Sequence, residues 1–178
     1  MAKSENTDEY FDSEEDLLAT IERARELRSA DELEESQELL LGLLDENPEN
    51  PLLLFEIGGS YDVMGEELSA IPYYRSAIAA GLDGSALQEC LVCLGSSLRL
   101  AGEWDEAVAI LEQAVDEFPD RSSGRVFLAL AQYSHGDSGS AVSNLLSLLL
   151  QTTSDEDILA YADALDYYKD NLDETLDG

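Results

Sequence analysis

The chain has 178 residues and a mass of 19.5 kDa, a length that favours a single domain. Its 40 Asp and Glu residues oppose nine Lys and Arg residues, which gives a formal net charge of -31. That balance argues against binding nucleic acid or anionic lipid, since both need basic surfaces. No apolar run approaches the roughly 20 residues of a membrane helix, and Met1 leads into acid rather than a signal stretch. We therefore expect a soluble, cytoplasmic protein.

The acid is concentrated toward both ends of the chain. Residues 1–12 have few apolar side chains, which predicts an acidic, disordered N-terminal tail. Only two of the nine basic residues are lysine. Three explanations of the acidity stay open: hydration in a high-salt habitat, general solubility, and a basic client protein.

Four series of residues recur along the chain at separations of 34, 37 and 34. Three series are small or apolar: Ala24, Gly58, Gly95 and Ala129; Ser36, Ala70, Ala107 and Ala141; Leu43, Ala77, Ala114 and Leu148. The fourth marks a turn in each unit: Asp31, Gly65, Gly102 and Gly136. A period near 34 predicts an all-α solenoid of helix–turn–helix repeats. We expect an array over 13–153 with units at about 17–50, 51–87, 88–121 and 122–153.

The residues within these units resemble the tetratricopeptide repeat. The third unit carries Leu91, Leu94-Gly95, Leu98, Ala107, Leu111, Ala114 and Pro119, and the second carries Leu54, Ile57-Gly58, Tyr61, Ala70, Tyr74 and Ala77. Runs such as Tyr74-Arg75 and Phe118-Pro119-Asp120 are similar to a family of short bacterial tetratricopeptide proteins of unsettled role. The resemblance covers roughly 17–153.

Two local features refine the predicted array. The three extra residues fall within 81–87, which predicts a lengthened turn with a left-handed glycine. Pro72 lies in a predicted second helix and is tolerated if that helix starts near 67–69, because first-turn amides have no intrahelical partner.

After the fourth unit we expect one acidic amphipathic capping helix and a tail over 154–178. Ser154 is its expected N-cap, and its apolar stripe is expected to cover the leucines of 145–150. The stripe consists of Ile158, Tyr161, Leu165, Tyr168, Leu172 and Leu176.

Catalytic and metal-binding patterns are weak. Cys90 and Cys93 have a spacing used in redox and metal sites, but no second pair accompanies them, which favours packing inside a helix. The lone His135 is interpreted as a solvated turn residue, and it supports no Ser-His-Asp arrangement. We therefore expect no enzyme activity, cofactor or metal.

In the resembling family, a concave groove is formed mainly by the first helix of each unit. Carried over to this sequence, the groove residues are Arg25, Arg28, Phe55, Asp62, Val63, Val92, Ser96, Arg99, Val126, Leu130 and Tyr133. They combine an apolar lining with three arginines, which favours a ligand with apolar anchors and some acid. Alternatively, the arginines only pair with neighbouring glutamates such as Glu22, Glu26 and Glu89.

The predicted function is a non-catalytic protein–protein interaction module, a scaffold or adaptor that holds an unidentified peptide or helix in this groove. Two alternatives stay open: an acidic escort for a basic client, and a self-associating architectural protein that forms a homodimer. The resemblance does not extend to a two-carboxylate clamp for chaperone tails. That clamp uses Lys and Asn at the fifth and ninth positions of the first unit, where this chain has Ile21 and Arg25, followed in the next unit by Phe55 and Gly59.

Overall fold

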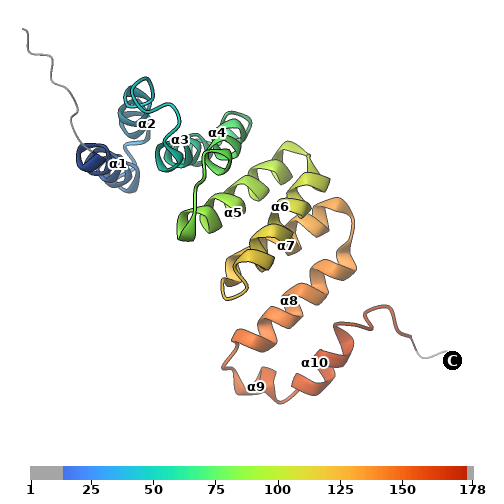
Figure 1. The fold of residues 1–178 in the computed structure, drawn as a ribbon. Helices are drawn as coiled ribbons and strands as arrows, with labels where there is room; N and C mark the ends of the chain where they lie inside the picture. Colours follow the sequence, from blue (N-terminus) through green and yellow to red (C-terminus); the bar gives the residue numbers. More distant parts are fainter. Residues whose placement is uncertain (1–13, 176–178) are drawn as a thin grey trace, which may run out of the picture.

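A computed structural model describes residues 14–175, which fold into ten α-helices without a strand (Figure 1). This confirms the predicted all-α class. The predicted tail at 1–12 lies outside the described residues. The first eight helices pair into four hairpins: α1 (Glu14–Ser29) with α2 (Leu33–Gly42), α3 (Pro51–Val63) with α4 (Glu67–Ala79), α5 (Gly84–Ala101) with α6 (Trp104–Glu117), and α7 (Ser122–His135) with α8 (Ser138–Thr152).

Each hairpin turns at a residue with left-handed backbone geometry. The φ angles are 67° at Asp31, 74° at Gly65, 82° at Gly102 and 97° at Gly136. These are the four positions of the predicted turn series. Glycine adopts this geometry without steric penalty, and Asp is among the few other residues that tolerate it.

Two glycines allow the close helix approach that the repeats require. A Cβ atom added to Gly58 would lie 2.7 Å from Cδ1 of Tyr74, and one added to Gly95 would lie 2.8 Å from Cδ1 of Leu111. Tyr74 and Leu111 are fully buried on the facing second helices. At the matching place in the first hairpin, the buried Ser36 hydroxyl donates to the Ala24 carbonyl at 2.7 Å. The predicted register is therefore confirmed in three hairpins.

The extra residues of the second unit do not lengthen a turn as predicted. Gly81 has the expected left-handed φ of 92°, but α5 already begins at Gly84. The insertion therefore adds a helical turn to α5, which has 18 residues. The connection between α4 and α5 stays short.

The helix α4 begins at Glu67, within the predicted range 67–69, but Pro72 is its sixth residue and therefore lies beyond the first turn. The proline nitrogen carries no hydrogen and cannot donate to the Leu68 carbonyl. Because Pro72 is exposed, water can hydrogen-bond to that carbonyl instead.

The predicted single capping helix is broken into α9 (Glu156–Leu159) and α10 (Ala162–Tyr168). Its N-cap is Asp155 rather than Ser154, since the Asp155 carboxylate accepts from the Asp157 amide at 2.9 Å. The helix α10 packs on α8 (Figure 1), but Tyr161 and Tyr168 of the expected stripe are exposed. Acids recur at spacings of three and four along 154–175 with Lys169 as the single base, which disfavours one continuous helix.

Candidate functional site

A groove pocket of about 520 Å³ opens between the first helices of three successive hairpins, α1, α3 and α5. Five predicted groove residues line it: Arg25, Arg28, Phe55, Asp62 and Val63. The lining also includes residues outside the predicted set, namely Glu56, Gly59, Tyr74, Ser85, Ala86, Glu89 and Cys93.

Glu56 is the principal partner of the two arginines in this pocket, and sequence reasoning missed it. Its side chain is only 4% exposed. Arg25 Nη2 donates to Glu56 Oε1 at 2.6 Å, and Arg28 Nη2 donates to Glu56 Oε2 at 2.6 Å. Arg25 Nη1 also donates to Glu22 at 3.1 Å. The hydrogen bonds to Glu56 raise the pKa of Arg25 above its usual value. By their contacts, both guanidinium groups are committed to carboxylates.

Three glutamates were expected to pair with the groove arginines. Only Glu22 forms an ion pair with one of these arginines. Glu26 pairs with Arg23, at 3.0 Å. Glu89 lines the groove pocket but forms no ion pair within residues 14–175.

Asp62 is the second carboxylate that α3 contributes to the pocket lining. It accepts from the Tyr74 hydroxyl at 3.0 Å and from the Ser97 hydroxyl at 3.2 Å. Burial raises the pKa of Asp62, and the two hydroxyls lower it only in part. Both of these partners are neutral, and across the described part of the chain no ion pair reaches this carboxylate.

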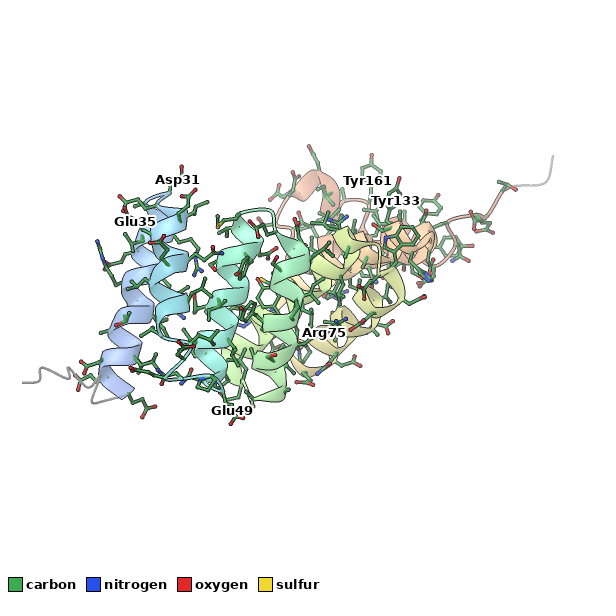
Figure 2. The ribbon with its side chains drawn as sticks, turned by 90° about the horizontal axis from the view of Figure 1, so that it is seen from above. Asp31, Glu35, Glu49, Arg75, Tyr133 and Tyr161 are labelled. Carbon is green, nitrogen blue, oxygen red and sulfur yellow. The ribbon has the colours of Figure 1, made fainter. Side chains whose placement is uncertain are left out.

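Six predicted groove residues lie outside the groove pocket. Val92 is buried, Ser96 is half-buried, and half-buried Arg99 has an Nε atom without a hydrogen-bond partner in the described chain. The other three form an exposed stripe on α7, which we call the α7 stripe: Val126, Leu130 and Tyr133. Tyr133 is the most exposed of them, at 67% (Figure 2). The structure therefore divides the predicted groove into a polar pocket and an apolar stripe.

The two cysteines face different surroundings on α5. Cys90 is fully buried, with its sulfur 3.7 Å from the Tyr74 carbonyl, whereas Cys93 borders the groove pocket. Burial raises the pKa of Cys90 to about 12 and that of Cys93 to about 11. Both thiols are thus protonated at neutral pH and poorly nucleophilic. His135 is exposed as predicted, and its Nε2 lies 2.8 Å from Asp105.

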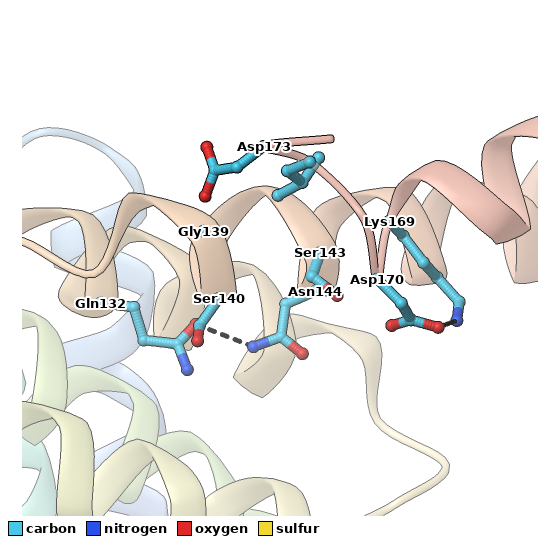
Figure 3. Close-up of a pocket in the computed structure, with 9 residues that line it drawn as sticks. Gln132, Gly139, Ser140, Ser143, Asn144, Lys169, Asp170 and Asp173 are labelled. Carbon is cyan, nitrogen blue, oxygen red and sulfur yellow. Dashed lines mark hydrogen bonds and ion pairs between the residues drawn. The ribbon is translucent and has the colours of Figure 1, made fainter. Parts of the chain in front are cut away.

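A second pocket, of about 440 Å³, lies where the C-terminal segment crosses α8 (Figure 3). Several of its polar side chains bond to one another: Asn144 donates to Gln132 at 2.8 Å, and Lys169 pairs with Asp170 at 2.6 Å. No sequence pattern indicated this pocket, because it depends on how the segment after α8 folds back.

Many of the described acidic residues are exposed, among them Asp31, Glu35 and Glu49 (Figure 2). Arg75 on α4 is itself held by acid, with its Nη2 atom 2.7 Å from Glu106 and 3.5 Å from Glu103. None of the described helices is long and apolar enough to span a membrane.

Residues 51–172 match the family model of the tetratrico peptide repeat, and the chain belongs to this family. This confirms the resemblance seen in the sequence. No curated protein matches the chain significantly in sequence.

Solved structures of low sequence identity share the fold. YrrB, described as a TPR protein with an unusual peptide-binding site, is 21% identical with a TM-score of 0.66, over 86% of this chain and 78% of its own. MamA 41-end from Desulfovibrio magneticus RS-1 is 13% identical with a TM-score of 0.67, over 86% and 85%. A putative kinesin light chain of Podosopora anserina with nearly identical TPR-like repeats is 20% identical with a TM-score of 0.70, over 91% and 93%.

Proposed function

We propose that this protein is a non-catalytic interaction module, a scaffold or adaptor that binds an extended or helical segment of a partner protein along its first helices. The observation that carries this proposal is the groove pocket, which is bounded by α1, α3 and α5. Proteins with tetratricopeptide repeats generally serve as protein–protein interaction modules, and YrrB is described as having a peptide-binding site.

The α7 stripe supplies a second contact region for the same segment. Val126, Leu130 and Tyr133 follow one another at spacings of four and three, so they share one face of α7. Exposed aromatic and aliphatic side chains are typical anchors of peptide recognition. A segment that crosses both regions would meet charged groups on α1, α3 and α5 and apolar groups on α7.

The test fills the pocket without disturbing the fold. A Cβ atom on Gly59 would approach only the flexible end of Arg28, at 3.4 Å, so Gly59→Leu is expected to fold and to occupy the pocket. Gly42→Leu is the matched control, because no atom lies within 4 Å of a Cβ built there and Gly42 is outside the pocket.

Random dodecapeptides displayed on phage are selected on the full chain, and the selected peptides are synthesised and titrated against both variants. We expect Gly59→Leu to weaken binding about tenfold or more, a loss of about 1.4 kcal/mol, and Gly42→Leu to leave it unchanged. Equal binding to both variants, with circular dichroism showing both folded, would place the site elsewhere.

A further inference from the structure

The groove pocket is acidic once its ion pairs are taken into account. Arg25 and Arg28 share the single carboxylate of Glu56, and Arg25 also contacts Glu22. Asp62 on α3 and Glu89 on α5 then remain on the pocket lining without an ion-pair partner among residues 14–175. Two of the three arginines that suggested an acidic ligand are therefore already neutralised by carboxylates of this chain.

An anionic ligand would have to compete with Glu56 for these arginines. Glu56 is buried, so a displaced Glu56 would keep its negative charge in a buried site. Leaving one member of a buried ion pair without its partner is strongly unfavourable. The arginine side of the pocket thus rejects an acidic group rather than attracting one.

A cationic group, in contrast, would be stabilised beside Asp62. This carboxylate is half-buried and bonded only to neutral hydroxyls, so burial disfavours its charged form and raises its pKa. A positive charge beside it would restore the Coulombic stabilisation that water no longer provides. Glu89 lies at the exposed part of the same lining and would add to that stabilisation.

We infer that the groove selects a cationic segment of a partner protein, with a lysine or arginine side chain entering between Asp62 and Glu89 and an apolar neighbour packing on Phe55 and Val63. This inference rests on the proposed function. The net charge of -31 favours such a partner by steering and repels a second copy of this chain.

The test uses the peptides selected on the full chain and two conservative variants. Asp62→Asn keeps an oxygen that accepts from Tyr74 or Ser97 while it removes the charge, and Glu89→Gln changes an exposed residue. The control is Glu112→Gln, an exposed acid on α6 outside the pocket. We expect lysine and arginine to be enriched in the peptides, and each groove variant to weaken binding about five- to tenfold.

A double-mutant cycle then assigns the contact. The basic residue of the best peptide is replaced by norleucine and titrated against the parent chain, both groove variants and Glu112→Gln. Non-additive losses with Asp62→Asn or Glu89→Gln, and additive losses with Glu112→Gln, support the direct contact. If circular dichroism shows that Asp62→Asn does not fold, the Glu89→Gln variant alone decides the outcome.

The outcomes separate this inference from the proposed function. Peptides that lose affinity for Gly59→Leu but are neutral or acidic would overturn the cationic inference and leave the groove function standing. If no peptide depended on Gly59, both would fail. Basic peptides that bound all charge variants equally would indicate attraction by the whole acidic surface, and they would overturn the inference.

Discussion

A single buried carboxylate links the first two hairpins. Glu56 on α3 holds Arg25 and Arg28 of α1 at 2.6 Å each, so three charges lie together at the side of the groove pocket. A buried ion pair gains little net stability over an apolar contact, because its charges must be desolvated. Removing one partner is different, since the remaining charges stay where water solvates them poorly.

This contrast predicts the effect of Glu56→Gln. The variant leaves two guanidinium groups facing each other, and we expect the free energy of unfolding to fall by about 1–3 kcal/mol. That range lies below the usual loss for a fully buried pair because Arg25 is 40% exposed. Urea unfolding measures the change. Glu22→Gln removes an exposed partner of the same Arg25 and should lower the free energy by less than about 1 kcal/mol; equal losses would contradict the assignment.

The sequence contained only a faint signal for Glu56. It is the one acid in the apolar run 52–59, but a chain with 40 acids offers no reason to single it out. Its role appears only when α1 brings Arg25 and Arg28 onto α3. Ser97 also gave no signal in the sequence: serine is common on surfaces, yet this one is fully buried, with its hydroxyl oxygen 3.2 Å from Asp62 Oδ1 and 3.0 Å from the Cys93 carbonyl oxygen.

At the scale of the helices, the repeated spacing predicts the hairpins well because each series has a steric cause. Residues with left-handed backbone must recur at the turns, and small residues must recur where two helices touch. The place of the three extra residues was not predictable, since Gly81 and Gly84 both look like turn residues. Only the structure shows that Gly84 starts a helix and Gly81 ends the preceding one.

Gly95→Leu tests this packing most directly. The added Cβ alone would lie 2.8 Å from Cδ1 of the fully buried Leu111, so α5 and α6 must separate. We expect a loss of about 1–3 kcal/mol from overpacking, measured by urea unfolding. Gly42→Leu is the matched control: nothing lies near its Cβ, and helix propensity should stabilise it by up to about 1 kcal/mol. A similar free energy of unfolding for the two variants would mean that the repeat register is wrong.

Across the whole molecule, contacts run mainly between neighbouring helices, and the chain forms an elongated array with its described ends far apart (Figure 1). Such an array buries each hairpin only against the next one, so its last hairpin needs a cover. The segment after α8 supplies it through α10. The cover is partial, because Leu145 is still 42% exposed and Leu149 37% exposed beside it.

Deleting residues 155–178 therefore tests whether this segment acts as a cap. Leu146, Leu148 and Leu150 are half-buried in the full chain, and losing α10 would add apolar area to the strip already exposed on α8. The shortened chain remains strongly acidic, so any association would come from apolar surface and should persist when salt screens the repulsion. Light scattering should show dimers or larger aggregates for this deletion. Deleting residues 1–12, which also removes acid, should leave the oligomeric state unchanged. A monomeric chain without 155–178 would show that α8 tolerates its exposed leucines unaided.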